Sequence, residues 1–423
     1  MLCQFTFENF KSFRDEATLD LCAEKIKEHE ESLIIDPFDG EGFLPIITIY
    51  GPNGGGKSNV LEAFIYLSYT VLMPIVALKA NESLQDEALG KGRMRYLKNY
   101  SIPEQEKHYL FDQESRNLPV KFDVLFRIGT TEYRYQLSLL HVAIVEENLY
   151  SKDIVSGDIE ILFERDSIDF YIGDILGDIK VGNIKSSIPI LSHLCINYDL
   201  KAINKIVSWF LNCQILDYDN PFHDKRIVFS NDKRKEDMFW KIFEEMDIGI
   251  KGIRIEKDTN GEITGLYTTH SLEDGSHFEL PIEEESSGTR KLFALLPFLL
   301  DCLHAGSLVI ADEMDTKLHP KLLRYIIELF TNPDINTKGA QLIFTSHDMS
   351  TMKPYVFRRD EIWFSTLNKT NASKLYSLVE FRKENGAKVR PDEIYDKQYI
   401  EGRYGADPYL KNILDWGRYN SEP

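Results

Sequence analysis

The chain has 423 residues, of which 43% are hydrophobic, and its 68 acidic and 49 basic residues give a net charge of −19. A chain of this length and apolar content can bury the cores of roughly two to three domains. The acidic balance argues against a protein that binds nucleic acid over its whole surface, although a local basic groove is compatible with it. No uninterrupted run of about 18 apolar residues is present, which argues against a membrane-spanning segment.

The five cysteines are scattered and form no C-x-x-C pair, and the first ten residues lack the basic-then-apolar layout of a signal peptide. These features are typical of a cytoplasmic protein with reduced thiols, not of one with a disulfide framework or a zinc site. Near the N-terminus, "CQFTFENF" and "EATLDLC" alternate apolar and polar residues at period two, which predicts a β-hairpin.

A phosphate-binding loop is predicted at "GPNGGGKSNVLEAF", where Gly51, Gly56, Lys57 and Ser58 fit the pattern G-x-x-x-x-G-K-[ST]. The glycines allow backbone N–H groups to approach phosphate oxygens that a side chain would block. Lys57 would reach the β- and γ-phosphates of ATP, and the Ser58 hydroxyl would help to hold Mg²⁺.

The flanking residues support this interpretation over a glycine-rich turn with a chance lysine. An apolar strand is expected at 45–50 and an amphipathic helix at 58–69, so the phosphates would lie at a helix N-terminus. The expected nucleotide-binding residues of this loop are Gly51, Asn53, Gly54, Gly56, Lys57, Ser58 and Asn59.

The middle of the chain alternates between helix and strand patterns. "GKGRMRYLKNY" (90–100) is the best local candidate for nucleic-acid contact, although most such basic patches are only solvated surface. Strand patterns between 120 and 172, with a turn at "IGTTEYRY", predict an antiparallel sheet. Apolar residues at helical spacing predict helices over about 185–250, interrupted at "NPFHDK" (220–225). "IRIEKDTNGEITGLYTT" predicts a further hairpin that turns at Asn260-Gly261.

Two short apolar strands are predicted in the last third of the chain, at "SLVIAD" and "QLIFTS". Asp312 ends the first and is expected to bind Mg²⁺, directly or through water. Glu313 follows at once, points in a different direction and is expected to orient or deprotonate the attacking water. His347 follows the second strand and fits a sensor of the γ-phosphate, although a lone histidine after a strand is more often a surface or core residue.

A second anion site is predicted at "EEESSGTRKLFALLPFLL", where a Ser-Ser-Gly turn opens a long apolar helix. Taken alone, this turn is more simply an N-cap. Since one chain rarely wraps two such sites around one phosphate chain, the economical arrangement is a dimer. In it, Ser286, Ser287 and Gly288 of one copy close over the nucleotide held by Lys57 of the other.

Together these motifs resemble the ABC-type ATPases of the SMC, RecF and OLD kind. "FENFKSFRDEATLDL" resembles the N-terminal strand pair of that group, residues 286–288 (the signature turn) stand at its signature motif, "DTKLH" (315–319) stands at its D-loop, and His347 matches its switch histidine. The resemblance implies a P-loop ABC-type ATPase core with ATP and Mg²⁺ as cofactors.

A narrower resemblance is to the stand-alone ATPases of prokaryotic defence and abortive-infection operons, RloA-like, AbiL-like and PARIS-type. It rests on "DEMDTKLHPKLL", "RRDEIWF", "SKLYSLVEFR" and "YIEGRYGADPYL". This resemblance implies a homodimer or higher oligomer that senses invasion and controls a separately encoded effector, such as a nuclease or toxin.

The sequence departs from the wider ABC pattern in two places. The signature reads "ESSGT", without the leading apolar residue, the second glycine and the glutamine, and Gln136 is only a weak candidate for the Q-loop glutamine. Both departures concern the efficiency of ATP hydrolysis more than the binding of ATP.

Three other functions are weighed against the defence ATPase. A RecF- or SMC-like DNA-repair clamp is the alternative, and the acidic charge and the lack of sustained heptads rank it second. An OLD-type nuclease is disfavoured because only 76 residues follow His347 and Asp392, Glu393 and Asp396 fit a solvated helix face. A transporter motor is disfavoured by the long mixed insertion.

The expected fold class is α/β: an ABC-type core with a mixed sheet, flanking helices and an antiparallel β subdomain, interrupted by α-helical insertions. The expected segments are 1–69 (N-terminal part of the core, with the phosphate loop), 70–116 (insertion with the basic patch), 117–172 (antiparallel part), 173–250 (helical insertion) and 251–423 (C-terminal part of the core).

Overall fold

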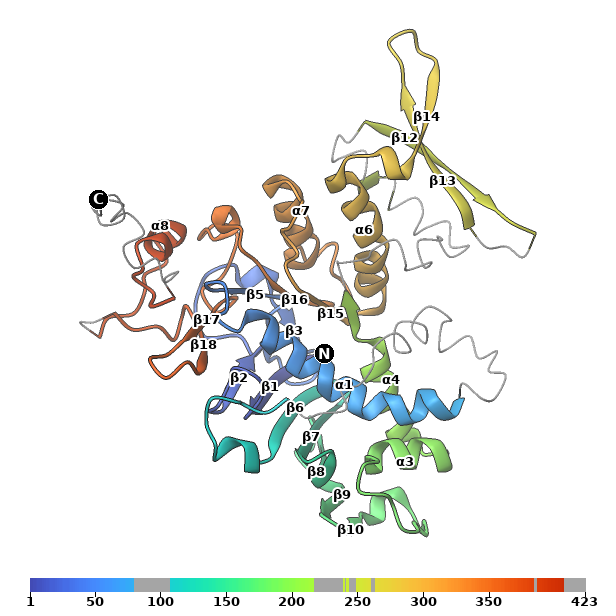
Figure 1. The fold of residues 1–423 in the computed structure, drawn as a ribbon, viewed down its shortest axis with the longest axis vertical. Helices are drawn as coiled ribbons and strands as arrows, with labels where there is room; N and C mark the ends of the chain where they lie inside the picture. Colours follow the sequence, from blue (N-terminus) through green and yellow to red (C-terminus); the bar gives the residue numbers. More distant parts are fainter. Residues whose placement is uncertain are drawn as a thin grey trace, which may run out of the picture.

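The computed structural model describes residues 1–79, 107–216, 239, 241–242, 249–259, 263–383 and 386–406 (Figure 1). The predicted basic patch (90–100), the predicted helix break (220–225) and the predicted Asn260-Gly261 turn lie outside these residues. The described residues form two large sheets, two small sheets and helices that cover both faces of the second large sheet.

The first large sheet is antiparallel throughout and has the strand order β10-β9-β8-β7-β6-β1-β2. Its strands are β1 (Leu2–Glu8), β2 (Ala17–Asp20), β6 (Val120–Ile128), β7 (Thr131–Leu140), β8 (Ala143–Asp153), β9 (Ile159–Asp166) and β10 (Asp169–Ile172). The two hairpins predicted from period-two alternation, β1–β2 and β6–β7, are confirmed. The N-terminal strand pair therefore lies in the same sheet as the strands after residue 119.

The second large sheet has the order β11-β15-β16-β5-β17-β18 and is parallel except for the antiparallel β17–β18 pair. Its strands are β11 (Gln214–Leu216), β15 (Leu308–Ala311), β16 (Gln341–Thr345), β5 (Ile46–Tyr50), β17 (Ile362–Leu367) and β18 (Ser373–Ser377). The three strands predicted from short apolar runs, β5, β15 and β16, are confirmed as parallel neighbours. The sheet thus joins an early strand to strands from the last third of the chain.

Side chains on the two faces of β5 enter two separate hydrophobic cores, because successive side chains of a strand point to opposite faces. Ile47 and Ile49 pack into the core shared with the antiparallel sheet and with α1 (Lys57–Lys79), α3 (Ile190–Asn197) and α4 (Lys201–Asn212). Ile46 and Tyr50 pack into the core shared with the second group of helices. That group comprises α6 (Ser287–Ala305), α7 (Pro320–Thr331) and α8 (Tyr395–Ile400). The mixed α/β fold predicted from the sequence is confirmed.

Helix α1 continues ten residues beyond the predicted end at 69 and contains Pro74. Burial of Val71, Leu72, Ile75 and Val76 against the core outweighs the local cost of the proline. Over Lys57–Leu78 the helix is long and apolar enough to cross a membrane by length and composition, but most of this stretch is buried inside the protein. Helix α1 is therefore a core helix of the fold.

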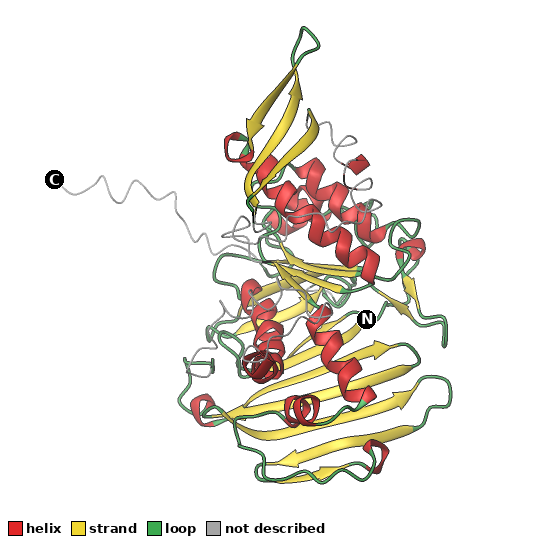
Figure 2. Cartoon of the chain, turned by 90° about the vertical axis from the view of Figure 1, so that its right-hand side faces the viewer, coloured by secondary structure: helices red, strands yellow, loops and turns green. Residues whose placement is uncertain are grey.

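A three-stranded sheet of β12 (Ile250–Lys257), β13 (Ile263–Ser271) and β14 (His277–Pro281) lies at the opposite end of the molecule from the antiparallel sheet (Figure 2). It leads through a short 3₁₀ turn (Ile282–Glu284) directly into α6. The hairpin predicted here is confirmed, and the third strand was not predicted. A small pair of strands, β3 (Ile34–Ile35) and β4 (Gly42–Phe43), completes the described elements.

Candidate nucleotide site

The predicted phosphate loop follows β5 and leads into the first turn of α1. Gly51, Gly54 and Gly56 all have positive φ angles, of 153°, 76° and 101°, which L-residues with side chains rarely adopt. A Cβ atom on Gly51 would lie 2.0 Å from the carbonyl oxygen of Ser365. The first helical hydrogen bond runs from the N–H of Val60 to the carbonyl of Gly56, so the N–H groups before it have no intrahelical partner. This arrangement suits an anion at the helix N-terminus.

Three serines from distant parts of the chain support the phosphate loop through hydrogen bonds. Ser365 on β17 and Ser373 on β18 each donate a hydroxyl hydrogen bond to the carbonyl of Gly55, at 2.8 and 2.9 Å. Ser12, from the β1–β2 connection, accepts from Ser373 and from the side chain of Asn59, both at 2.7 Å. The Asn59 amide, predicted to contact the nucleotide, is thus engaged in holding the loop to the antiparallel sheet. No sequence signal pointed to these serines, since they belong to no spacing motif.

Lys57 folds back onto its own loop in this structure. Its ammonium donates to the carbonyls of Gly51 (2.9 Å) and Pro52 (3.1 Å), and the residue is only 6% exposed. Burial lowers the pKa of Lys57, and the nearby carboxylates of Asp312 and Glu313 act in the opposite direction. The phosphate loop and the predicted acidic pair are therefore close enough to interact electrostatically.

Asp312 and Glu313 follow β15, and both are held by Thr345 at the end of the neighbouring strand β16. The Thr345 hydroxyl donates to Asp312 Oδ1 at 2.5 Å and accepts the N–H of Glu313 at 2.7 Å. Asp312 makes no other hydrogen bond among the described residues, so its second oxygen is available to a cation. Glu313 has a left-handed φ of 45°, which residues other than glycine rarely adopt. Its side chain is 55% exposed.

His347 lies beside this pair, as the neighbouring strands require. Its Nε2 is 3.8 Å from Glu313 Oε1, and its side chain is 40% exposed. Its backbone N–H donates to Asp315 Oδ2 at 3.1 Å, so the segment after β16 is tied to the predicted D-loop. The structure therefore brings together Lys57, Asp312, Glu313 and His347.

The signature turn lies at the start of α6, not at the phosphate loop. Ser286 caps α6 by accepting the N–H of Thr289 at 3.1 Å, which confirms the N-cap. A Cβ atom on Gly288 would lie 2.9 Å from the carbonyl oxygen of Lys317, so the first turn of α6 packs against the D-loop. Within the described part of the chain, no hydrogen bond or ion pair joins residues 286–288 to the phosphate loop. Among the described residues, the phosphate loop and the signature turn therefore lie at two helix N-termini that have no direct bond to each other.

Gln136, the weak Q-loop candidate, belongs to the antiparallel sheet. Its amide donates to Asp123 at 2.9 Å and accepts from Asn148 at 3.4 Å, both on neighbouring strands. None of its interactions within the described residues is with the phosphate loop. The hydrogen bonds of Gln136 thus join neighbouring strands of the antiparallel sheet, and Gln136 does not belong to the candidate site.

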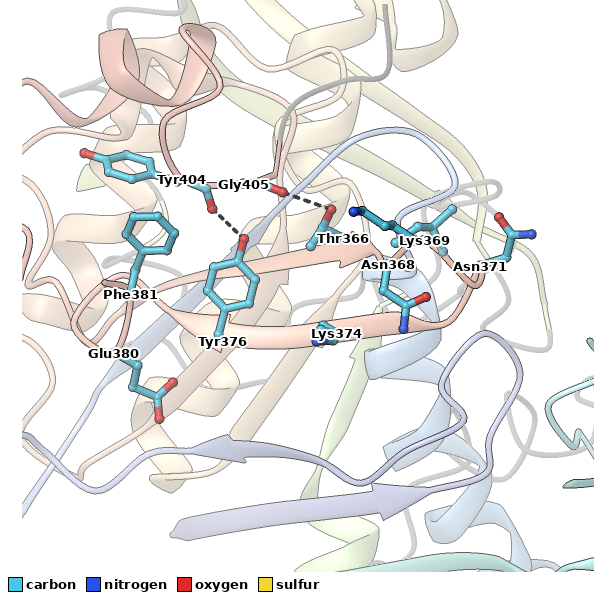
Figure 3. A pocket seen from close by; sticks show the side chains of 11 residues that line it. Thr366, Asn368, Lys369, Asn371, Lys374, Tyr376, Glu380, Phe381, Tyr404 and Gly405 are labelled. Atoms are coloured by element: carbon cyan, nitrogen blue, oxygen red, sulfur yellow. Dashed lines mark hydrogen bonds between the residues drawn. The ribbon is translucent and has the colours of Figure 1, made fainter. Parts of the chain in front are cut away.

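A cavity of about 820 Å³ lies on the other face of the β17–β18 hairpin (Figure 3). Its wall is formed where Tyr376 donates to the carbonyl of Tyr404 and Thr366 donates to that of Gly405. Thr366 follows Ser365 on β17, and Tyr376 lies three residues after Ser373 on β18. Because successive side chains of a strand point to opposite faces, Thr366 and Tyr376 face away from the phosphate loop. No residue of that loop lines the cavity, which is therefore separate from the candidate nucleotide site.

The segment "RRDEIWF" contributes a buried ionic cluster at the start of β17. Arg358 is fully buried and donates to the carboxylate of Asp360 and to the carbonyls of Glu24 and Glu28. Asp360 also accepts the N–H of Glu24. In this structure the cluster fastens the segment after β2 to the second large sheet.

Comparison with solved structures finds partial likenesses, of which two follow. The structure described as "Crystal structure of the SmcHead bound to the C-winged helix domain of ScpA" is 13% identical, with a TM-score of 0.44, over 89% of this chain and 97% of that one. The "Dimeric structure of a post-hydrolysis state of the ATP-binding cassette MJ0796 bound to ADP and Pi" is 12% identical, with a TM-score of 0.27, over 89% of this chain and 100% of that one.

Sequence comparison gives a clearer result. No curated protein matches the chain. One family model, described as "AAA domain, putative AbiEii toxin, Type IV TA system", matches residues 46–353, from β5 through the segment after His347. Since this match covers most of the chain and includes both the phosphate loop and the acidic pair, the chain belongs to that AAA-domain family.

Proposed function

We propose that this protein is a Mg²⁺-dependent ATPase of the ABC type that closes as a homodimer around ATP. Each ATP would lie between the phosphate loop of one copy and the signature turn of the other. The observation that carries this proposal is that one chain has two helix N-termini suited to an anion, at Lys57 and at Ser286, with no hydrogen bond or ion pair between them among the described residues. A second copy supplies the missing half of each site.

The residues of the site fit ATP and Mg²⁺ by their chemistry. Lys57 can exchange its two loop carbonyls for phosphate oxygens, which are stronger partners for an ammonium group. Ser58 and the second oxygen of Asp312 offer the hard oxygen ligands that Mg²⁺ prefers. When bound, Mg²⁺ neutralises charge that develops on the phosphates. Glu313 is exposed, so that an attacking water can reach it as a base, and His347 stands beside it as a γ-phosphate sensor.

The biological role that we propose is in prokaryotic anti-phage defence, as a cytoplasmic sensor and scaffold. The description of the family refers to an AbiEii toxin and a type IV toxin–antitoxin system. The resemblance to stand-alone ATPases of abortive-infection operons points the same way. In this role the ATP-bound dimer would control a separately encoded effector, such as a nuclease or toxin, because the effector would bind that dimer differently from the ATP-free protein.

The oligomeric state in ATP tests the composite site. In a Glu313→Gln background, which slows hydrolysis, sedimentation should show a dimer with Mg·ATP and a monomer without it. Adding Ser286→Arg should leave ATP binding to each monomer nearly intact and prevent the dimer, because the bulky cation replaces the helix cap. A dimer that forms equally well with Ser286→Arg would reject the composite site. Turnover that depends on added DNA would favour the DNA-clamp alternative over the defence role.

A further inference from the structure

One buried lysine on α6 points at the loop that carries the proposed base. Lys291 is only 5% exposed, and its ammonium donates to the carbonyls of Glu313 (3.2 Å) and Thr316 (2.6 Å). Burial lowers the pKa of Lys291 to about 8; Lys317 adds to the lowering, and the carboxylates of Asp315 and Glu313 oppose it. Lysines are almost never this buried unless they are paired. The contacts to two backbone carbonyls therefore call for an explanation.

The loop that Lys291 holds has an unusual backbone. Glu313 and Lys317 both have left-handed φ angles, of 45° and 65°, without being glycine. Such conformations are unfavourable for residues other than glycine and persist only where the surroundings fix them. For Glu313 the fixing comes from both sides of the residue: Thr345 accepts its N–H, and Lys291 binds its carbonyl. The direction of the Glu313 carboxylate thus depends on Lys291.

The same helix face meets this loop at a second point. Gly288 approaches the carbonyl of Lys317 so closely that a Cβ atom would lie 2.9 Å from it. Since Gly288 and Lys291 are three residues apart, they lie on one face of α6. The first turn of α6 and the loop after Asp312 are therefore joined at two places, and a displacement of the signature turn is transmitted to Glu313.

We propose that Lys291 is a positioning residue that couples the two ATP sites of the dimer. This inference rests on the proposed function, in which the signature turn of one copy contacts the nucleotide of the other while Glu313 acts on its own. Lys291 links these two contacts within one chain. Closure of the signature turn on one ATP then sets the base that hydrolyses the second ATP, so the two sites act together.

The test compares Lys291→Met, which keeps the length of the side chain and removes its donors, with Lys291→Arg, which keeps them. Lys291→Met should bind ATP within about threefold of wild type, lose about tenfold or more in kcat, and lower the Hill coefficient of turnover towards 1. Lys291→Arg should recover part of the kcat and part of the Hill coefficient. The matched control is Arg290→Met, because among the described residues the Arg290 side chain donates to the carbonyl of Glu283 on the exposed side of the turn and to no group of the loop after Asp312; it should leave both quantities unchanged.

The outcomes separate the coupling from the proposed function. Normal kcat and an unchanged Hill coefficient in Lys291→Met, with a cooperative wild-type enzyme, would overturn the coupling and leave the composite site standing. A wild-type protein that neither dimerises nor hydrolyses ATP would overturn the proposed function itself. If Lys291→Met shows no thermal unfolding transition, Lys291→Gln, which keeps a neutral donor, takes its place with the same expected changes and the same disproof.

Discussion

Asp312 and Glu313 are adjacent in sequence but have different proposed roles. The Thr345 hydroxyl binds an oxygen of Asp312 and the backbone of Glu313, so one side chain fixes both residues. The proposed metal ligand and the proposed base therefore share one support. Their individual contributions can be separated by isosteric amides.

Glu313→Gln and Asp312→Asn should fail in different ways. Glu313→Gln keeps the shape of the site and removes the base, so it should bind Mg·ATP normally and hydrolyse it about 10²–10⁴-fold more slowly. Asp312→Asn should weaken Mg²⁺-dependent binding itself, because a neutral amide is a poorer ligand for a hard cation. A turnover assay beside a Mg·ATP titration on both variants checks this. An equal loss of binding in both, or near-normal turnover in Glu313→Gln, would contradict these roles.

Sequence patterns predicted the residues whose type is dictated by chemistry and missed those that act on the backbone. Lys57 and Asp312 were predicted because a phosphate and a metal ion demand particular groups at particular spacings. Thr345, Ser365 and Lys291 support the site through loop carbonyls and N–H groups that every residue possesses. Such contacts depend on which strands become neighbours, so no spacing in the chain announces them.

At the scale of elements, helix α3 is capped by a buried carboxylate from the antiparallel sheet. Glu147 on β8 accepts the N–H groups of Ile190 and Leu191, at 2.6 and 3.1 Å, and the hydroxyl of Tyr135 at 3.0 Å. Burial raises the pKa of Glu147 to about 7, although these hydrogen bonds act against the rise. The cap that joins helix to sheet is thus sensitive to pH.

The pH dependence of stability follows from the sign of this shift. Because the folded-state pKa of Glu147 exceeds the unfolded value, its stabilising contribution is full below about pH 4.5 and is lost as the pH rises through about 7. The urea midpoint of wild type, relative to that of Glu147→Gln, should therefore fall between pH 5 and pH 8. Glu146→Gln, at the exposed neighbouring position, is the control and should show no such trend. A constant difference between wild type and Glu147→Gln would refute the shift.

A second element-scale prediction concerns the cluster that fastens the segment after β2 to β17. Arg358→Met should lower the free energy of unfolding by about 3–5 kcal/mol, because it leaves the carboxylate of Asp360 buried without its cation. Arg390→Met removes an exposed ion pair with Asp392 and should change stability by less than about 1 kcal/mol. Urea denaturation of both variants measures the difference, and equal effects would show that burial is not the cause.

Local sequence patterns predicted some strands and helix ends correctly and missed others. Strands β5, β15 and β16 were predicted from runs of consecutive buried apolar residues. Strand β11 has only three residues, too few to display a period, and it joins the sheet because β15 offers an open edge. Helix α1 ran past its predicted end because tertiary burial outweighed a proline, which a local pattern does not reveal.

At the scale of the whole molecule, a composite site predicts rescue between two inactive variants. Lys57→Ala should lack ATP binding at its phosphate loop, and Ser286→Arg should lack a working signature turn. In a mixed dimer, one site combines the intact loop of one copy with the intact turn of the other. Mixing the variants should therefore restore ATP-dependent association, in at most about half of the dimers, since about half of the pairings are mixed and each has one complete site. Sedimentation of the mixture with Mg·ATP decides, because turnover of a mixed dimer would also need the coupling through Lys291, and no dimer beyond that of the separate variants would count against the shared site.

The place of β5 in its sheet also bears on how the protein is made. On the ribosome β5 emerges early, yet both strands that flank it, β16 and β17, are synthesised roughly 300 residues later. Two of the three serines that support the phosphate loop, Ser365 and Ser373, lie on β17 and β18 and are therefore synthesised equally late. A nascent chain therefore exposes the apolar stretch "IITIY" without neighbours, which makes it a segment for chaperones to shield. It also follows that a half-made chain lacks the strands that complete the proposed nucleotide site, so only finished copies would enter the proposed ATP-dependent assembly.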